Sequence, residues 1–463
     1  MDRRVYFIEA KSPGAHVFSA YAIPRLGTIL LATILKQKGY ETKVFIEDIA
    51  KPDWKEFQGA NIVGISTITS TATRAYRMAD RLRAEGKTVI MGGPHPTFLP
   101  DEALEHCDYV IRGEGEEALV ELLEHIEGKR PAEGIGGLSY KTDAGNVHNP
   151  SRKFIKDLTE HPAPDFSLVH EWKAKKGVIP IATSRGCPFD CKFCSVIHMF
   201  GRKYRFKPID RIIEEIKAVW FKGAFIFFVD DNFTADRART KELLKRIISD
   251  GLKIEWSAQV RSDAAKDREL LRLMKKSGCT NVYIGFESVN QKTLELMNKK
   301  QGLEDIKGAI AGFKDFGIRI HGMFVLGMDT DDEETIRDTQ RFAREMNIES
   351  VQFLILTPLP GTPVYEELKA QGRILHTDWS KYDALHTVFR PARMTPAQLQ
   401  RGVFKAMARF YSWSKILRHA ASFNFYCGAL NLYGKMAVRK ARRQSELYLK
   451  EALENIPKFG LKG

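Results

Sequence analysis

The chain has 463 residues, 43% of them hydrophobic and 28% charged, which is the composition of an ordinary globular protein with two or three domains. No apolar run reaches the length of a membrane span, and a strand pattern begins at once, so we expect neither a spanning helix nor a signal peptide. Six cysteines in so long a chain exclude a disulfide framework and suit a reducing cytoplasm.

The positive charge is concentrated at the end of the chain. The net charge is +14, and residues 401–463 contribute +10 of it through 13 Lys or Arg and 3 Asp or Glu. The 400 residues before them carry only +4, so the body of the chain is nearly neutral. Partners that select positive charge, such as an anionic membrane surface, are therefore expected at this end.

Residues 1–130 alternate between strand and helix patterns. Strands are predicted at residues 4–9, 42–46, 62–66, 87–91 and 109–111, and helices at 23–38, 72–84 and 116–126. This alternation predicts a doubly wound, Rossmann-like α/β domain, whose ligands bind at the carboxyl ends of its parallel strands. Two of those ends suit a large ligand: the hydroxyl-rich Ser66–Thr71, and Gly92–Gly93, where missing side chains expose the backbone.

Residues 131–177 are rich in glycine and proline and are expected to form a connector with a small hairpin near residues 138–148. From residue 178 to 368 a second strand–helix series follows. Its strands are predicted at 178–183, 224–229, 253–258, 280–286, 319–326 and 350–356, and its helices at 209–220, 235–249, 267–276, 303–316 and 333–346. Six β/α units predict a partial (β/α)6 barrel, with its site at the carboxyl ends of the strands.

Three cysteines follow the first strand of the second series. Cys187, Cys191 and Cys194 stand in the pattern C-x3-C-x2-C, and thiolates are the ligands of iron–sulfur clusters. Three cysteines hold three irons of a cubane and leave the fourth open to chelate a small molecule through an amino and a carboxylate group. The alternative is a zinc site in which His198 joins the same three cysteines.

Phe193 completes the spacing C-x3-C-x-aromatic-C, and here the sequence resembles the radical S-adenosylmethionine (SAM) superfamily. The resemblance implies a [4Fe–4S] cluster that splits SAM into methionine and a 5′-deoxyadenosyl radical, which abstracts hydrogen from the substrate. It also implies contacts to SAM at the strand ends: Asp230, Asp231 and Asn232 for the methionine ammonium, Arg261 for the carboxylate, Glu287 for the ribose hydroxyls, and the stretch from Gly322 to Gly327 for adenine.

The first domain resembles the cobalamin-binding domain that precedes many radical SAM barrels. Ser66 with Ile68 matches that family's hydroxyl motif, and Gly92–Gly93 matches its paired glycines. The signature D-x-H-x-x-G, which supplies the lower cobalt ligand, is missing from the first loop, so we expect no first-loop histidine ligand. His16 and His95 are possible substitutes, and a domain that binds no corrin is the alternative.

Together the motifs resemble class B radical SAM methyltransferases. The resemblance implies methyl transfer to an unactivated carbon: one SAM methylates cobalamin and a second supplies the radical. It also implies a small-molecule or lipid substrate and a reductase such as flavodoxin or ferredoxin. Alternatives are cobalamin-dependent radical cyclisation or rearrangement of a lipid, isoprenoid or tetrapyrrole, and a non-catalytic metal-binding module that associates with RNA or membrane. Nucleic acid is not expected, because no RNA-binding module is recognisable.

The C-terminal region, residues 369–463, is basic and mostly helical in pattern, with many aromatic residues ahead of the basic run from Arg439 to Arg443. Two interpretations remain open. The helices can cap the open barrel, with a solvated basic side, or they can hold the protein peripherally on an anionic membrane and bring the active site to an apolar substrate. Cys279 and Cys427 are expected to be buried core thiols.

Overall fold

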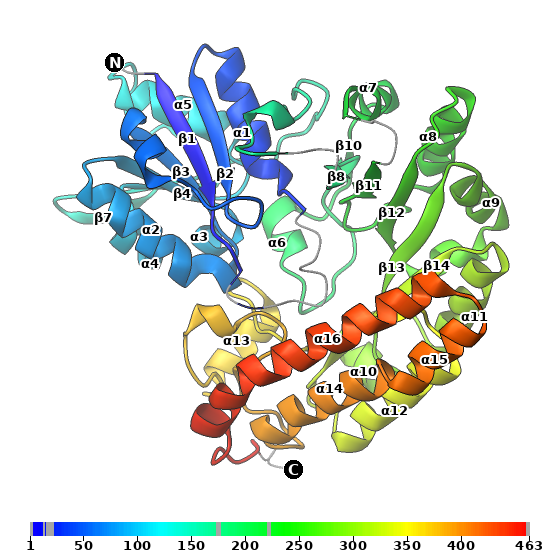
Figure 1. Ribbon diagram of the computed structural model, residues 1–463. Coiled ribbons are helices and arrows are strands. Elements are labelled where there is room, and N and C mark those ends of the chain that lie inside the picture. Colours follow the sequence, from blue (N-terminus) through cyan, green and yellow to red (C-terminus); the bar gives the residue numbers. More distant parts are fainter. Residues whose placement is uncertain (1–2, 13, 15–22, 173–176, 220–223, 460–463) are drawn as a thin grey trace.

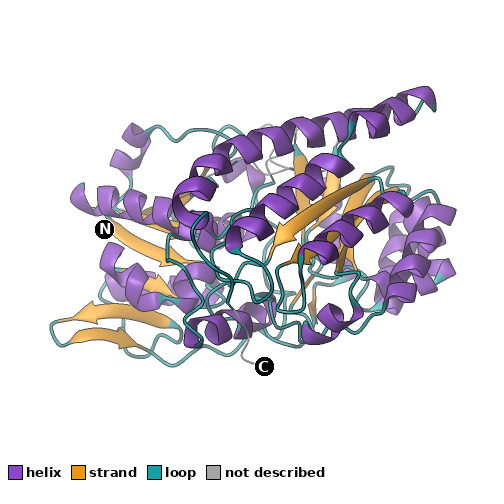
Figure 2. Ribbon diagram, turned by 90° about the horizontal axis from the view of Figure 1, so that it is seen from below, coloured by secondary structure: helices purple, strands orange, loops and turns teal. Residues whose placement is uncertain are grey.

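The computed structural model describes residues 3–12, 14, 23–172, 177–219 and 224–459. Two α/β units lie side by side, and the helices of the C-terminal region cross the second unit (Figure 1). The strands of the two units form separate groups, each enclosed by helices (Figure 2). No helix of the described residues is long and apolar enough to cross a membrane.

The first unit is built on a mixed sheet of seven strands. In chain order they are β1 (Arg4–Glu9), β2 (Glu41–Ile46), β3 (Ile62–Ser66), β4 (Thr88–Gly92), β5 (Tyr109–Ile111), β6 (Leu138–Thr142) and β7 (Gly145–His148). Their order in the sheet is β2-β1-β3-β4-β5-β6-β7, and β1 to β5 are parallel. The hairpin β6–β7 pairs antiparallel with β5. The first sheet therefore runs to residue 148, beyond the predicted boundary at 130, and the predicted connector contributes two of its strands.

Helices cover both faces of this sheet, as the alternating pattern predicts. Helices α1 (Leu26–Gln37) and α5 (Glu116–Ile126) bury their apolar residues with one face, and α2 (Ala72–Ala84) and α4 (Pro100–His106) with the other. Two short helices, α3 (Pro94–Phe98) and α4, follow the paired glycines and are absent from the sequence prediction. Each begins at a proline, which suits the first turn of a helix because that position needs no N–H.

The second unit has six parallel strands in the order β15-β14-β13-β12-β11-β8. The strands are β8 (Val178–Ile181), β11 (Phe225–Phe228), β12 (Glu255–Val260), β13 (Cys279–Glu287), β14 (Arg319–Leu326) and β15 (Ser350–Ile355). The helices between them are α7 (Ile209–Val219), α8 (Arg237–Ser249), α9 (Arg268–Lys276), α10 (Gln291–Leu296), α11 (Leu303–Asp315) and α12 (Glu333–Glu345). Strands β8 and β15 are the two edges of an open sheet, so the predicted partial barrel is confirmed.

Between β8 and β11 the chain forms a two-stranded hairpin of β9 (Ser184–Arg185) and β10 (Arg205–Phe206), with α6 (Val196–Phe200) in its loop. The three cysteines lie between β9 and α6.

The C-terminal region is an integral part of the second core. It contains α13 (Pro363–Ala370), α14 (Pro396–Phe410), α15 (Trp413–Ala421) and α16 (Phe425–Tyr448). Helix α14 buries its apolar face against β15 and α12, and the hydroxyl of Tyr411 donates to the carbonyl of Val351 at 2.7 Å and accepts from its N–H at 3.0 Å. Cys279 and Cys427 are both buried, as expected. The helices therefore cap one edge of the barrel sheet, which is the first of the two interpretations.

Candidate functional site

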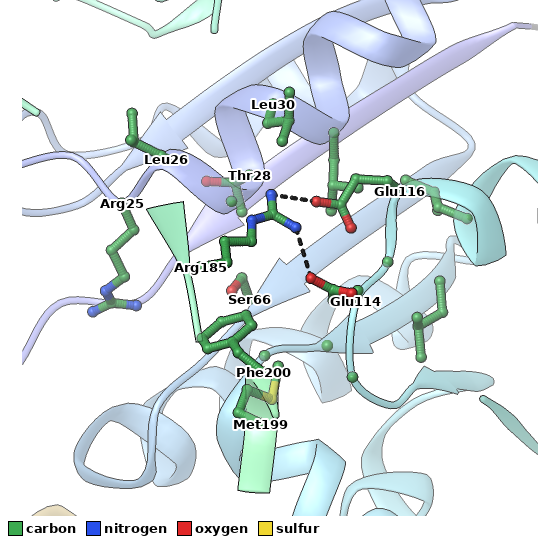
Figure 3. A pocket seen from close by; sticks show the side chains of 18 of the residues that line it. Arg25, Leu26, Thr28, Leu30, Ser66, Glu114, Glu116, Arg185, Met199 and Phe200 are labelled. Atoms are coloured by element: carbon green, nitrogen blue, oxygen red, sulfur yellow. Dashed lines mark hydrogen bonds and ion pairs between the residues drawn. The ribbon is translucent and has the colours of Figure 1, made fainter. Parts of the chain in front are cut away.

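A cavity of about 390 Å³ lies where the carboxyl ends of the two sheets meet (Figure 3). The first domain contributes both predicted ligand loops, Ser66 with Ile68 and Gly92 with Gly93. The barrel contributes Asp231 together with residues of β9 and α6. The deep part of the cavity is apolar, because its walls come from the cores on either side of the sheet. These walls include Phe7, Leu30, Leu31, Ile65, Ile90, Met91, Ile111 and Leu119.

The paired glycines fit a large ligand for two different reasons. A Cβ on Gly92 would meet only the carbonyl oxygen of Ile111, at an ordinary 3.5 Å, so a side chain there would extend into open space beside the cavity. A Cβ on Gly93 would lie 2.8 Å from the carbonyl oxygen of Thr67, and Gly93 has φ +92°. Gly93 therefore serves the close packing of two loops, whereas Gly92 keeps space free for the ligand.

His95 is not available as a cobalt ligand in this structure. Its ring is fully buried, with Nδ1 3.3 Å from Thr69 Oγ1 and Nε2 3.2 Å from Glu102 Oε1. The indole of Trp379 lies edge-on to it with ring centroids 5.0 Å apart, and its N–H donates to Glu102 at 2.7 Å. His95 thus joins the first domain to the C-terminal region. His16, the other predicted substitute, lies outside the described residues.

A buried ion-pair network crosses the boundary between the two domains beside the cavity. Glu114, in the loop between β5 and α5, accepts from Arg185 at 3.0 Å and from Arg205 at 2.7 Å. Arg185 also pairs with Glu116 at 2.5 Å (Figure 3). Burial alone would raise the pKa of Glu114, but the hydrogen bonds from Arg205 and from the N–H of Ile155 outweigh it, so this pKa lies below its usual value. The carboxylate is therefore ionised and fully partnered.

The cysteine loop lies directly after β9, two residues beyond Arg185. All three thiols are partly exposed, and burial raises the pKa of Cys191 and that of Cys194, the latter to about 11. The hydroxyl of Tyr204 lies 3.9 Å from the sulfur of Cys187. His198 is exposed on α6, and no three His, Cys, Asp or Glu side chains of the described chain stand together as a site for a single metal ion.

The predicted SAM contacts Asp230 and Asp231 differ in where their carboxylates lie. Asp230 is buried and accepts from the N–H of Thr183 at 3.0 Å and from the hydroxyls of Thr183 and Ser184, so its carboxylate holds the end of β8 and is not free to contact SAM. Asp231 faces the cavity; burial, and then the neighbouring Asp230, raise its pKa to about 7. Asn232 is buried and donates weakly to Tyr204 at 3.4 Å.

Two further predicted contacts, Arg261 and Glu287, lie around the cysteine loop. The guanidinium of Arg261 stacks on the ring of Phe189 at 3.7 Å, and its buried Nε has no hydrogen-bond partner among the described residues, although Asp263 is 3.6 Å away. Glu287, at φ +63°, pairs with Lys299 at 2.6 Å. The sequence does not predict Lys299, which shares the site with Glu287.

The two glycines predicted for adenine are both packed against side chains of the fold. A Cβ on Gly322 would lie 3.2 Å from the ring of Phe286, and one on Gly327 would lie 2.8 Å from Leu399 of α14. The N–H of Gly327 donates to the buried carboxylate of Asp331 at 2.9 Å, as does that of Met328 at 3.0 Å. Gly322 and Gly327 therefore serve the packing of the barrel wall. Any contact with adenine would come from other backbone groups between these two glycines.

Known proteins match both halves of this arrangement. The protein family described as "B12 binding domain" matches residues 18–123, and the family described as "Radical SAM superfamily" matches residues 181–343. An uncharacterised methyltransferase of Pyrococcus horikoshii is 34% identical over 85% of this chain and 89% of its own length. The bacteriochlorophyllide d C-12(1)-methyltransferase of Chlorobaculum tepidum is 31% identical over 89% of this chain and 88% of its own length.

The chain belongs to the cobalamin-binding radical SAM family. The fold agrees: the radical SAM methyltransferase TsrM of Kitasatospora setae, solved with cobalamin and a [4Fe–4S] cluster, superposes with a TM-score of 0.72 at 18% identity, over 96% of this chain and all of that chain. The chain is a cobalamin-dependent radical SAM methyltransferase, and its cofactors are a [4Fe–4S] cluster, SAM and cobalamin. The zinc site, the corrin-free domain and the non-catalytic metal module are thereby set aside.

Replacing Glu114 by Gln should destabilise this radical SAM protein strongly. The change leaves the buried guanidinium of Arg205 without its carboxylate and leaves Arg185 with Glu116 alone, which costs roughly 3–5 kcal/mol in free energy of unfolding. Glu117→Gln is the matched control, since Glu117 pairs with Arg152 at 2.6 Å while more than half exposed, and should cost roughly 0–1 kcal/mol. Urea denaturation measures both. Equal effects of the two changes would contradict a special role for Glu114.

Asp331 should make stability depend on pH in a defined window. Burial raises its pKa to about 6, so between about pH 4 and pH 6 the folded chain holds a proton that the unfolded chain has released. The stability this group contributes is complete below about pH 4 and is lost as the pH rises through about 6. The free energy of unfolding should be measured for wild type and for Asp331→Asn across this pH range. The wild-type value minus the variant value should fall by up to about 3 kcal/mol as the pH rises. A constant difference would rule this out.

Proposed function

We propose that this enzyme methylates a carbon atom of a mostly apolar small molecule, with cobalamin held in the cavity between the two domains. One observation carries the proposal: the cavity is lined at once by the cobalamin-motif loops of the first domain and by Asp231 of the barrel. The two cofactors of the reaction would then meet across a single enclosed space. The apolar walls of that space would exclude water, which protects reactive species from side reactions.

We propose that Cys187, Cys191 and Cys194 hold the cluster and that SAM binds to its open iron. Arg261 is our candidate for the methionine carboxylate, because it lies beside the cysteine loop and its buried Nε makes no hydrogen bond to the described residues. Asp231 and Asn232 remain the candidates for the ammonium, and Asp230 would act by fixing the strand end on which they stand. Glu287 would reach the ribose hydroxyls together with Lys299. When bound, the cofactors supply a 5′-deoxyadenosyl radical and a transferable methyl group.

We place the substrate in a second cavity of about 470 Å³ that shares Ile68 and Pro94 with the first. Ser195, beside the cluster loop, and the C-terminal segment from Tyr382 to Leu385 also line it. Its described lining contains no Lys or Arg, so a carboxylate on the substrate would lie outside this cavity. A tetrapyrrole, the substrate class of the Chlorobaculum tepidum relative, or another large apolar molecule suits such walls.

Two partners complete the proposal. A flavodoxin or ferredoxin would supply the electron for the cluster. An anionic membrane surface would bind the basic C-terminal region peripherally, where Arg439, Lys440, Arg442 and Arg443 are all exposed. The decisive test of function is product analysis after anaerobic incubation with SAM, a reductant and candidate tetrapyrroles or polycyclic lipids. A product heavier by one methyl group is expected; a cyclised product without added methyl would overturn methyl transfer.

Any one of the three cluster cysteines should be indispensable. Anaerobically reconstituted wild type should hold about four iron and about four sulfide per chain, as a cubane requires. Cys191→Ala should lose the cluster and SAM cleavage together. Cys427→Ala, which removes a thiol buried in the C-terminal region, should keep both. Labile sulfide unchanged in Cys191→Ala, measured by colorimetric assay, would contradict the assignment.

Gly92→Val should block cobalamin uptake without unfolding the domain. Its Cβ meets no atom closer than 3.5 Å, valine suits a strand, and the remaining methyl groups would enter the space assigned to the corrin. Gly308→Val on α11 is the matched control, since a Cβ there meets nothing within 4 Å and the position is exposed. The absorption spectrum after anaerobic loading and desalting reports uptake. Normal uptake by Gly92→Val would overturn the placement.

A further inference from the structure

Most of the exposed large apolar side chains gather on two helices. Among the described residues, eleven large hydrophobic side chains are exposed, and eight of them lie between residues 413 and 447. Seven form what we call the apolar face: Trp413, Leu417, Phe423, Phe425, Tyr426, Leu432 and Met436. Phe423 is 81% exposed and Phe425 67%, values that are unusual for aromatic residues of a folded domain. Isolated exposed apolar residues are normal, but a cluster of this size indicates a partner.

The way α16 packs explains why its apolar residues point outward. Its buried face consists of small or polar residues at helical spacing, namely Cys427, Asn431, Gly434, Val438, Ala441 and Ser445. A Cβ on Gly434 would lie 2.5 Å from the ring of Tyr411, so the helix backbone sits directly on the core. The opposite stripe carries Phe425, Leu432 and Met436 and then, along the same line, Arg443.

The charged side chains of α15, and those of α16 as far as residue 445, are all cations. The chain has no Asp or Glu between residues 384 and 445. Lys435 lies over the ring of Trp413 at 5.2 Å, which places the two helices side by side. The other cations of α15 and α16 outside the core are Arg418, Arg439, Lys440, Arg442 and Arg443.

The part of the apolar face on α15 and at the start of α16 lies at the end of the barrel opposite the cofactors. From there α16 runs back toward the carboxyl ends of the strands, where Tyr448 donates to the carbonyl of Thr387 at 2.8 Å. Lys415 donates to the carbonyl of Ile348 at 2.8 Å, and Arg319 stacks on Tyr426 at 4.0 Å. Arg319 begins β14, and Ile348 lies just before β15. The cysteine loop and both cavities are at the carboxyl ends of the strands. In Figure 1, accordingly, α15 and the start of α16 lie beside α11 and β14, far from the first domain.

We propose that the apolar face and its cations dock the protein on an anionic lipid bilayer, with the outward sides of α15 and α16 against the lipid. Aromatic and aliphatic side chains would enter the boundary between headgroups and acyl chains, and the flanking Lys and Arg would pair with headgroup phosphates. A second copy fits less well, because a two-fold contact would set the many cations of these helices against the same cations of the other copy. Bulky aliphatic residues likewise have no role in contacting nucleic-acid phosphates.

This orientation changes what a membrane would do for the enzyme. One of the two interpretations of the sequence has the C-terminal region bring the active site to the bilayer. The structure instead puts Phe423 and Phe425, which are highly exposed residues of the apolar face, at the end of the barrel opposite the cavities. The bilayer is therefore an anchor, and the substrate enters from the aqueous side. The inference concerns the location of the protein and does not depend on which carbon is methylated.

Vesicle flotation tests the inference on the full-length holoenzyme. Wild type should bind phosphatidylglycerol vesicles at low salt and bind phosphatidylcholine vesicles weakly. Serine at Trp413, Leu417, Phe423 and Phe425 together should lower the partition coefficient on anionic vesicles at least about tenfold. Glutamine at Arg439, Lys440, Arg442 and Arg443 should remove the salt-sensitive part. The control is a double variant, Ile248→Ser on α8 with Arg211→Gln on α7, at two positions that are both exposed. It should bind the vesicles as wild type does.

The possible outcomes separate the alternatives. Wild type that ignores anionic vesicles overturns the proposal, and so does concentration-dependent self-association that the four-serine variant abolishes. Quenching of tryptophan fluorescence by brominated anionic lipid should depend on Trp413, and equal quenching in Trp413→Phe would overturn the orientation. SAM cleavage should be unchanged in every variant. Lost cleavage in wild type would count against the proposed chemistry alone, since binding to vesicles is measured independently of it.

Discussion

The arrangement of the whole molecule depends on the buried carboxylate of Glu114. A buried ion is stable only when its charge and its hydrogen-bonding atoms all have partners. Glu114 comes from the cobalamin-binding domain, and its two guanidinium partners, Arg185 and Arg205, come from the barrel. All three are satisfied only when the carboxyl ends of the two sheets face each other. That position encloses the cavity, and it sets the cysteine loop beside it, because Arg185 is two residues from Cys187.

The C-terminal region holds the same two domains from another side. Trp379 bonds to Glu102 and packs on His95, both in the cobalamin-binding domain, while α14 fills the edge of the barrel sheet. A Cβ on Gly361, shortly before this region, would strike the ring of Phe98, so the chain that leads into the region also lies tightly against the first domain. The helical cap is therefore also a clamp, and its residues Tyr382 to Leu385 reach the second cavity. A single chain segment thus serves both domain packing and the wall of a binding site.

What the sequence could reveal was local. Strand and helix periodicity placed the longer elements of both sheets but missed short ones such as α3, α4 and α10. The spacing of Cys187, Cys191 and Cys194 identified the chemistry, because it too is a pattern of neighbouring residues. The partners of Glu114 lie 71 and 91 residues away, and no local pattern connects them. Asp230 and Asp231 are adjacent and chemically identical, yet Asp230 is hydrogen-bonded to Thr183 whereas Asp231 faces the cavity. That difference depends on the direction in which each side chain points at the end of β11. The amino-acid composition does not specify this direction.

The apolar face on α15 and α16 is a different kind of constraint, because the fold does not require it. The contact of α16 with the core is made by its small residues, and Phe425, Leu432 and Met436 stand on the opposite side. Polar residues at these positions would suit a solvated helix at least as well, since exposed apolar groups gain nothing from folding. The same holds for Trp413 and Leu417 on α15. Their apolar character therefore finds its reason outside the folded chain, in a surface that covers them and tolerates only positive charge around it.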